Sequence, residues 1–380
     1  MKQIKQIKEV DVAILGGGPA GTSLALTLCL YSNLKVAAIE QTAYENIRVG
    51  ENVSASLLPL LDYLQVKESF LADHHQPVYN HSAVWGNSLV SSRPSLFSQF
   101  GEGYLLDRRQ FDFMLAEQVF SQGGKLFLQT KCQEGEHLEG GGWRLVLNHH
   151  SGEQFLLDSR YLVDATGRQS RIAKRLGAKS IVCDSLVGIS AFLDFETDRP
   201  KTEDILVESR PEGWWYSAWL PDGKLSIAFM TDIDIMRQQQ LHKESSWSRL
   251  LSQAPHTCQR TQGGRLVYPL TVKPAHSHIL DRAVGDDWIA VGDAATAFDP
   301  LSSMGIGYAM TSGSHAAVAL NEYLSGNKSE LLKEYQSGLK RNFETYLRMR
   351  HIYYDLEKRW REAPFWQRRT QLTSIPIDAK

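Results

Sequence analysis

The sequence has few cysteines, and no two of them lie close together. The four in 380 residues, Cys29, Cys132, Cys183 and Cys258, form no C-x-x-C pair. This spacing argues against a structural zinc site and against a disulfide framework, and it fits a reducing compartment. We therefore expect no metal cofactor.

Neither sign of charge dominates, and no long apolar run is present. The chain has 41 basic and 43 acidic residues, a net charge of −2, so no global field recruits nucleic acid or an anionic membrane. Glycines 16–18 interrupt the apolar stretch behind the basic N-terminus, which argues against a signal peptide, and no apolar run reaches the ~20 residues of a membrane span. We expect a cytoplasmic protein without nucleic-acid or membrane partners.

The composition, 42% hydrophobic and 22% charged, is that of a globular protein. Two kinds of residue pattern alternate along the chain. Near the N-terminus, a short apolar strand, a helix at residues 20–31 and a second strand form a βαβ unit. Later segments instead alternate polar and apolar residues, which is typical of a largely antiparallel, half-buried sheet. We predict an α/β fold with a first domain at residues 1–75, 106–176 and 277–329, an inserted mainly antiparallel β-sheet domain at 76–105 and 177–276, and a C-terminal helical segment at 330–380.

A glycine-rich string joins the first strand to the first helix. Gly16-Gly-Gly18-Pro-Ala-Gly21 matches G-x-G-x-x-G, in which the first glycine permits a tight turn, the second lets backbone approach a pyrophosphate, and the third allows close packing of helix and strand. Glu40 ends the second strand, where a carboxylate can accept hydrogen bonds from ribose hydroxyls and repels a 2′-phosphate. The pattern predicts FAD or NAD rather than NADP.

Two later strings favour FAD. In residues 291–307, Asp293 ends a buried strand and can accept a hydrogen bond from a ribityl hydroxyl. Gly305 and Gly307 open the next helix, whose free N–H groups can stabilise negative charge on an electron-poor ring. Residues 161–168 form a second strand-to-turn element that can lie against the adenosine half of the cofactor.

With these motifs in this order, nearly the whole chain resembles the flavoprotein monooxygenases of the p-hydroxybenzoate-hydroxylase superfamily, and within it the branch containing the flavin-dependent tryptophan halogenases. The resemblance implies a Rossmann-like FAD-binding domain of the glutathione-reductase type. It also implies that Arg48 and Arg108 reach the cofactor, that Cys132 lies on the strand meeting the adenine, and that Pro300 lies beside the flavin ring. The implied cofactor-binding residues are Gly16, Gly18, Pro19, Ala20, Gly21, Glu40, Gln41, Arg48, Gly50, Arg108, Cys132, Asp164, Ala165, Gly167, Asp293, Pro300, Gly305, Ile306 and Gly307.

The halogenases of this branch carry a lysine about thirty residues after the glycine-glutamate that Gly50-Glu51 matches, and a W-x-W-x-I-P signature. Residues 81–86 contain no lysine, and residues 213–221 begin like the signature but then depart from it. Halogenation is therefore disfavoured, and hydroxylation of an electron-rich aromatic ring by oxygen activated at the flavin is the preferred interpretation.

No residue is assigned as catalytic by spacing alone. Glu51, His81 and Asp299 are candidate proton-transfer groups, each with an alternative role in a turn or cap. Candidates for the substrate side, each of which could instead be a plain core residue, are Glu51, Trp85, Trp215, Tyr216 and Met230.

The C-terminal segment is basic and aromatic. Residues 331–369 carry ten Lys/Arg against five Asp/Glu, interleaved with eight aromatic residues. These aromatics can cap the core or present a docking surface to a protein. Together with the Gly213-Trp-Trp-Tyr-Ser-Ala string, the ending 359–369 resembles the flavoproteins that mature the cysteine tryptophylquinone of lysine and glycine oxidases. That resemblance implies hydroxylation of a tryptophan in a partner precursor protein.

Other interpretations stay open. The chain could hydroxylate or halogenate a free indole or phenol, it could be a flavin-binding assembly factor without catalysis, or it could saturate isoprenoid chains. The sequence does not specify the reductant, which is either NAD(P)H or a separate reductase, and it does not specify the oligomeric state.

Overall fold

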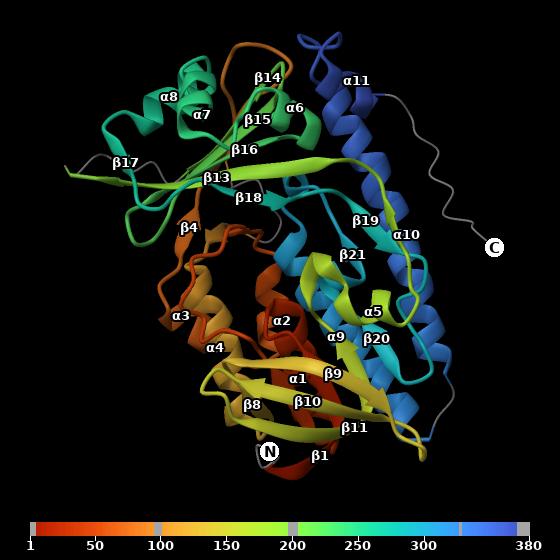
Figure 1. The fold of residues 1–380 in the computed structure, drawn as a ribbon. Helices are drawn as coiled ribbons and strands as arrows, with labels where there is room; N and C mark the ends of the chain where they lie inside the picture. The colour runs from red at the N-terminus through yellow and green to blue at the C-terminus, as the bar shows by residue number, and fades with distance from the viewer. Residues whose placement is uncertain (1–4, 95–100, 197–203, 327–328, 371–380) are drawn as a thin grey trace.

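The computed structural model describes residues 5–94, 101–196, 204–326 and 329–370. Two large sheets lie at opposite ends of the molecule, and the long helix α10 runs along its side (Figure 1). The α-helices are α1 (Pro19–Tyr31), α2 (Leu57–Tyr63), α3 (Lys67–Ala72), α4 (Arg108–Ser121), α5 (Arg171–Arg175), α6 (Ile233–Gln238), α7 (Glu244–Leu251), α8 (Pro255–Thr261), α9 (Gly305–Leu324), α10 (Glu330–Asp355) and α11 (Pro364–Thr370). The strands are β1 (Lys5–Leu15), β2 (Val36–Ile39), β3 (Asn52–Val53), β4 (Gln76–Val78), β5 (Asn80–Val84), β6 (Ser91–Pro94), β7 (Gly103–Leu105), β8 (Lys125–Phe127), β9 (Thr130–His137), β10 (Trp143–His149), β11 (Gln154–Asp164), β12 (Ser180–Val182), β13 (Leu186–Phe195), β14 (Asp204–Arg210), β15 (Gly213–Trp219), β16 (Leu225–Asp232), β17 (Gly264–Leu266), β18 (Thr271–Pro274), β19 (His278–Leu280), β20 (Trp288–Ala290) and β21 (Thr296–Ala297).

The lower sheet contains the predicted βαβ unit. Its order is β8-β2-β1-β11-β10-β9, with β20 paired to β11, and β1 runs parallel to both β2 and β11. Residues Val12 to Leu15 are buried on both faces of the sheet, as expected for a parallel strand. Helix α1 packs on α9 at close range, because a Cβ on Gly313 would lie 2.2 Å from the Ala20 carbonyl oxygen.

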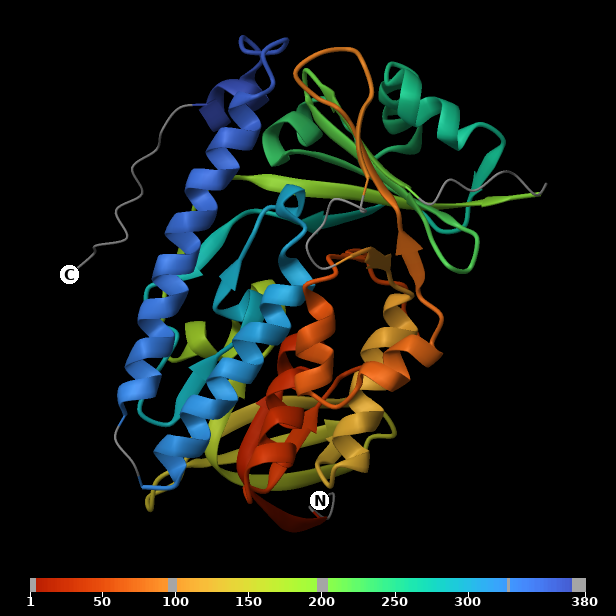
Figure 2. The ribbon, with the colours of Figure 1, turned by 180° about the vertical axis from the view of Figure 1, so that it is seen from behind.

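The upper sheet has the order β17-β13-β16-β15-β14-β5-β6, with β18 paired to β13, and every pair is antiparallel except β14 with β5. The predicted alternating segments therefore form strands of one largely antiparallel sheet. One face carries a core in which Trp215 stacks against Phe229 and Trp247 of α7. Helices α6, α7 and α8 cover this face, and the opposite face looks toward the lower sheet (Figure 2).

Two small sheets lie between the large ones. Strands β3, β7 and β4 form one, and β12, β19 and β21 form the other. Strands from residues 76–105 are thus divided, because β4 and β7 join a small sheet while β5 and β6 join the upper one. The domain boundaries proposed above stay a prediction.

The C-terminal helices cover the junction of the two halves. Tyr354, Phe365 and Trp366 are fully buried and pack in one cluster with Trp214 and Leu186. These three aromatics therefore cap the core, which is one of the two roles that the sequence allowed. Residues 371–380 of the predicted C-terminal segment lie outside the described residues. Within the described part of the chain, no helix combines the length and hydropathy needed to cross a membrane.

Candidate functional site

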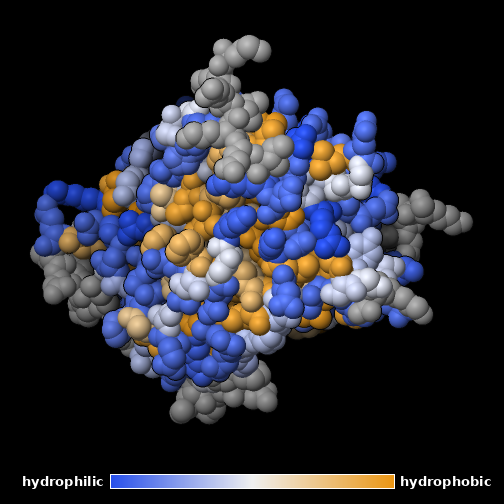
Figure 3. Space-filling model, turned by 90° about the horizontal axis from the view of Figure 1, so that it is seen from below, coloured by the Kyte–Doolittle hydropathy of each residue, from blue (hydrophilic) through white to orange (hydrophobic). Residues whose placement is uncertain are grey.

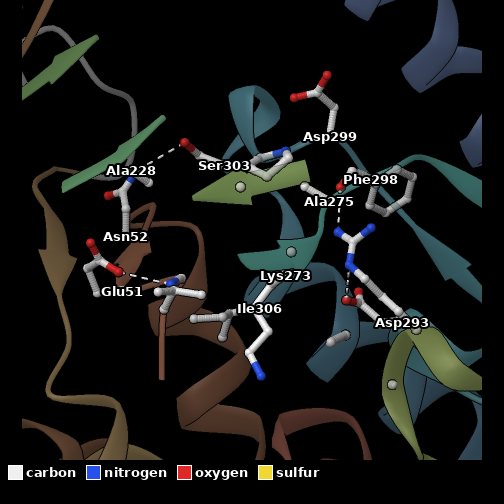
Figure 4. A pocket seen from close by; sticks show the side chains of 18 of the residues that line it. Glu51, Asn52, Ala228, Lys273, Ala275, Asp293, Phe298, Asp299, Ser303 and Ile306 are labelled. Carbon is white, nitrogen blue, oxygen red and sulfur yellow. Dashed lines mark hydrogen bonds and ion pairs between the residues drawn. The ribbon is translucent and has the colours of Figure 1, made fainter. Parts of the chain in front are cut away.

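A cavity of about 410 Å³ lies between the upper sheet and the N-terminal ends of α1 and α9 (Figure 4). It brings together segments from most of the chain length. Of the sequence-predicted residues, it is lined by Gly18, Pro19, Ala20, Gly50, Glu51, Arg108, Ala165, Gly167, Tyr216, Met230, Asp293, Asp299, Pro300, Gly305 and Ile306.

The glycines of the first fingerprint have separate geometric roles. Gly16 has φ +120°, and a Cβ there would lie 2.1 Å from the Ala165 carbonyl oxygen. A Cβ on Gly21 would lie 2.0 Å from the Gly16 carbonyl oxygen, whereas a Cβ on Gly18 would meet nothing within 4 Å. Gly16 and Gly21 are therefore required by the protein's own packing, and Gly18 leaves space open toward the cavity.

Helix α9 presents a second open N-terminus to the same cavity. Asp299 and Pro300 lead into a 3-10 turn, and α9 then begins at Gly305 without a side-chain cap. A Cβ on Gly305 or on Gly307 would meet nothing within 4 Å. Gly307 itself does not line the cavity.

These two N-termini fit FAD. Each of the two helices leaves backbone N–H groups and a partial positive charge at its start, and α1 also lacks a side-chain cap at Gly18. The start of α1 would hold the pyrophosphate, and the start of α9 would face the electron-poor edge of the ring. Asp293, in the 3-10 turn that follows β20, lines the same cavity and would hold a ribityl hydroxyl.

Arg168 fixes the position of Asp293. Its Nε lies 3.3 Å from Asp293 Oδ2, and its other nitrogens donate to the carbonyl oxygens of His276 and Phe298. Enclosure raises the pKa of Asp293, and the charges of Arg168 and Arg108 offset part of that rise. Sequence analysis missed Arg168, although it directly follows the predicted Gly167.

Three predicted cofactor residues, Glu40, Gln41 and Cys132, lie outside the cavity, whereas Ala165 and Gly167 of the 161–168 element line it. Glu40 is buried and accepts hydrogen bonds from the Gly17 N–H at 2.9 Å and from the Thr42 hydroxyl at 2.6 Å. Gln41, next to it, is exposed. Cys132 on β9 is partly buried, and burial raises its pKa to about 11. Their contact with a cofactor stays a prediction.

Two arginines are tied together through one buried carboxylate. Arg48 and Arg108 both bind Asp112 on α4, at 3.0 and 2.9 Å, and Arg108 also donates to the carbonyl oxygens of Val49 and Gly50. Asp112 is fully buried. This ion-pair cluster holds the 48–51 segment against the cavity, so Arg108 lines the cavity while Arg48 lies behind it.

Asp164, predicted to bind the cofactor, has a structural role in the described contacts. Its carboxylate accepts hydrogen bonds from the Thr166 N–H and hydroxyl and from the N–H groups of Ile172 and Ala173. The side chain is fully buried and does not line the cavity. It shapes the turn that brings Ala165 and Gly167 to the cavity wall.

The upper sheet forms the opposite wall. Cross-strand pairs Tyr216–Ala228 and Trp214–Met230 place these side chains on one face. Trp215 points to the other face, into the core under α7, so its prediction as a substrate-side residue is wrong. Trp85 also does not line the cavity.

Trp85 and His81 lie on or beside β5, away from the cavity lining. Trp85 packs edge-on against Trp366, and its Nε1 donates to the Tyr353 carbonyl oxygen at 2.9 Å. His81 pairs with Ile205 in the parallel β5–β14 ladder. Neither residue is placed for the substrate-side or proton-transfer role that the sequence suggested.

Asp299 lines the cavity and is held by the C-terminal helix. Tyr354 donates to Asp299 Oδ2 at 2.7 Å and accepts from Trp214 Nε1 at 3.0 Å. The Tyr346 hydroxyl accepts a hydrogen bond from the Asp299 N–H at 2.8 Å, and Arg350 Nε lies 3.4 Å from Asp299 Oδ2. Helix α10 therefore positions two walls of the cavity at once.

Sequence analysis also missed Lys273. This residue of β18 lines the cavity opposite Gly188 of β13, and its side chain extends into the pocket (Figure 4). Among the described residues, Lys273 has no ion-pair or hydrogen-bond partner. The cavity therefore does contain an ammonium group, although residues 81–86 include no lysine.

Replacing Asp293 with alanine should weaken FAD binding. The variant loses an acceptor for a cofactor hydroxyl, and a hydrogen bond to a charged group contributes about 1.5–3 kcal/mol, so the dissociation constant should rise on the order of tenfold or more. Titration of FAD-free protein, followed by flavin fluorescence, measures this change. Unchanged affinity in Asp293→Ala would contradict the assignment.

Comparison with known proteins agrees with this geometry. The family model described as "FAD binding domain" matches residues 9–348. The chain is 36% identical over 372 residues to the putative FAD-dependent oxidoreductase LodB of Marinomonas mediterranea, covering 97% of this chain and 99% of LodB.

Two solved structures share the fold. The myxobacterial chondrochloren halogenase CndH superposes with a TM-score of 0.88 at 18% identity, over 97% of this chain and 87% of its own. The peptidyl tryptophan dihydroxylase QhpG superposes with a TM-score of 0.77 at 22% identity, over 96% of this chain and 80% of its own. On these matches, the chain belongs to the FAD-binding-domain family, and it is an FAD-dependent oxidoreductase.

Seen from below, hydrophobic residues lie mostly toward the middle of the face, with hydrophilic residues among and around them (Figure 3).

Proposed function

We propose that this oxidoreductase is a monooxygenase that hydroxylates an aromatic ring, and that the ring is a tryptophan side chain of a partner precursor protein. The observation that carries the proposal is the arrangement of the cavity. The two helix N-termini that fit the flavin share the cavity with a sheet wall that includes the small residues Gly188, Ser190 and Ala228. When bound, the flavin supplies the activation of oxygen, and the protein supplies orientation and exclusion of water.

The relatives support this choice of substrate. QhpG is a peptidyl tryptophan dihydroxylase essential for tryptophylquinone cofactor biogenesis, and the present chain has the same fold. The large coverage of LodB places the chain among flavin-dependent oxidoreductases of the same length.

A second candidate, halogenation, is favoured by one observation. Lys273 brings into the cavity an ammonium group that no side chain of the described residues pairs with, and it comes from β18 rather than from residues 81–86. An ammonium group can hold a hypohalous acid by hydrogen bonding. The halogenase CndH shares the fold.

The two candidates are distinguished by the mass of the product. FAD-loaded protein is supplied with a flavin reductase, ¹⁸O₂ and bromide, and with either a tryptophan-containing peptide or free tryptophan. We expect ¹⁸O in the indole of the peptide. ¹⁸O in free tryptophan alone would favour a small-molecule hydroxylase. Bromine in the product, lost in Lys273→Met, would establish the second candidate, and oxygen consumption without any modified product would contradict both.

A further inference from the structure

One side of the cavity carries buried polar atoms that lack partners. Among the described residues, Glu51 Oε1, Asn52 Oδ1 and Tyr216 Oη have no hydrogen-bond partner outside this cluster, and all three residues line the cavity. Leaving a buried polar group unpaired costs about 1–3 kcal/mol. Such a cluster in a cavity wall is the expected signature of a polar contact with a ligand.

The Glu51 carboxylate is held in a fixed position. Its Oε2 accepts a hydrogen bond from the Gly50 N–H at 2.9 Å, its backbone carbonyl accepts from the Leu106 N–H at 2.9 Å, and the residue is 3% exposed. Figure 4 shows Glu51 and Asn52 on the side of the pocket opposite to Asp293. Among the described residues, the remaining oxygen, Oε1, has no donor beyond the neighbouring Tyr216, and a carboxylate oxygen has lone pairs for a second hydrogen bond.

Tyr216 lies next to this oxygen. Burial raises the pKa of the phenol well above 10, and the charge of Glu51 and hydrogen bonding between the two side chains raise it further. The phenol therefore keeps its proton at neutral pH. Together the two side chains present an acceptor and a hydroxyl on one side of the cavity.

The wall beside them is lined by small side chains. It is formed by small residues on three neighbouring strands, which pair as Gly188–Met230, Ser190–Ala228 and Ala228–Tyr216. We call this surface the small-residue floor; it consists of Gly188, Ser190, Ser226 and Ala228. Trp214, Tyr216 and Met230 stand around it. A planar ring lying on the floor has its edge directed at the surrounding side chains, and Glu51 brings a charged acceptor to this side of the cavity, next to Tyr216.

We propose that Glu51 determines substrate specificity by accepting, at Oε1, a hydrogen bond from the ring N–H of an indole-type substrate that lies on the small-residue floor beside Tyr216. The inference rests on the proposed function for the substrate being an aromatic ring. To the proposed function it adds the residue that recognises the ring and the ring atom, the N–H nitrogen, that the residue binds.

Binding of two probes to FAD-loaded protein tests this contact. Indole carries the N–H donor, and 1-methylindole lacks it; binding of each is followed by the change in flavin absorbance. We expect wild type to bind indole on the order of tenfold more tightly than 1-methylindole, because a hydrogen bond to a charged acceptor is lost. In Glu51→Gln the amide oxygen must accept the Gly50 N–H, so the NH₂ group, a donor, takes the place of Oε1 and the two probes should bind with nearly equal affinity.

Control variants separate this contact from other effects. Glu68→Gln removes the same charge from an exposed position on α3, and it should keep the wild-type preference for indole. FAD content and thermal midpoint show whether Glu51→Gln is folded. If the methyl group only clashes with the wall, the preference for indole will persist in Glu51→Gln, and the proposal is overturned.

Other outcomes also decide the matter. Equal binding of both probes by wild type, or no binding of indole at its solubility limit, overturns the proposal. A preference for phenol over anisole without a preference for indole over 1-methylindole overturns the N–H assignment. Indole binding that depends on Glu51, without oxygen or halogen in any product, upholds this inference and refutes the proposed function.

Discussion

Replacing Asp232 with asparagine is expected to destabilise the fold by about 3–5 kcal/mol, because it leaves a buried guanidinium without its counter-charge. Asp232 ends β16, and Arg369 on α11 binds it with its two Nη atoms at 2.7 and 3.1 Å. The two side chains are 1% and 2% exposed. Arg369 also packs over the Phe365 ring, 3.6 Å from its centroid, so it cannot reach solvent without moving α11.

Chemical denaturation of the two proteins measures the difference. Asp234→Asn is the matched control, since Asp234 is 57% exposed and pairs with Arg368, which is 44% exposed. An exposed pair of this kind contributes about 0–1 kcal/mol. Equal losses in both variants would show that the buried pair does not hold α11 in place.

The effect of Asp232 should also depend on pH. Burial alone would raise the pKa of Asp232, but hydrogen bonds and charges from Arg369 and Arg368 lower it below 3.8 overall. A carboxyl group with a lowered folded-state pKa stabilises the fold above its unfolded value and loses this effect as pH falls through the folded value. The stability gap between wild type and Asp232→Asn should therefore be full above about pH 4 and narrow below it.

Gly21→Ala is expected to lower the stability of the fold, whereas Gly18→Ala is expected to lower only the affinity for FAD. At Gly21 the new Cβ would lie 2.0 Å from the Gly16 carbonyl oxygen and 3.1 Å from Ile14 Cγ2. Because the first contact is with backbone, α1 must shift, and we expect a loss of about 1–3 kcal/mol or more in the FAD-free protein. FAD binding should be lost with it.

At Gly18 the backbone has φ −76° and ψ 179°, which alanine adopts freely, and no atom lies within 4 Å of the new Cβ. FAD-free Gly18→Ala should therefore be as stable as wild type, while its FAD affinity falls by about 1–3 kcal/mol because the methyl group fills the space needed by the pyrophosphate. Thermal melting of FAD-free protein and fluorescence titration with FAD measure the two effects. Wild-type affinity in Gly18→Ala would show that the phosphates do not approach this turn.

Features set by local sequence were predictable. The βαβ unit follows from residues adjacent in the chain, since the turn glycines, the buried strand and the helix carry their own signals. The alternating segments also predicted strands correctly. Helices α6 to α8 were not predicted within the segment 177–276, because α6 and α8 are too short to give a strong periodicity.

Features set by long-range register were not predictable. Trp214 and Trp215 are neighbours in a run of aromatics, and only the pairing of β15 with β16 decides which one faces the cavity. Lys273 reaches the cavity because β18 pairs with β13, about eighty residues earlier in the chain. A single sequence holds no signal for either pairing.

Helix α10 has a mechanical consequence for how substrate reaches the cavity. It runs along the side of the molecule from the level of the lower sheet to that of the upper sheet (Figures 1 and 2). Arg350, near its C-terminal end, binds both Asp184, just before β13, and Asp299, just before the 3-10 turn that leads into α9. The helix thus connects the upper and lower halves of the molecule. A hinge rotation that moved the two halves apart would have to break these ion pairs. Access to the cavity should therefore be controlled by local movements at its rim, with the two sheets remaining fixed relative to each other.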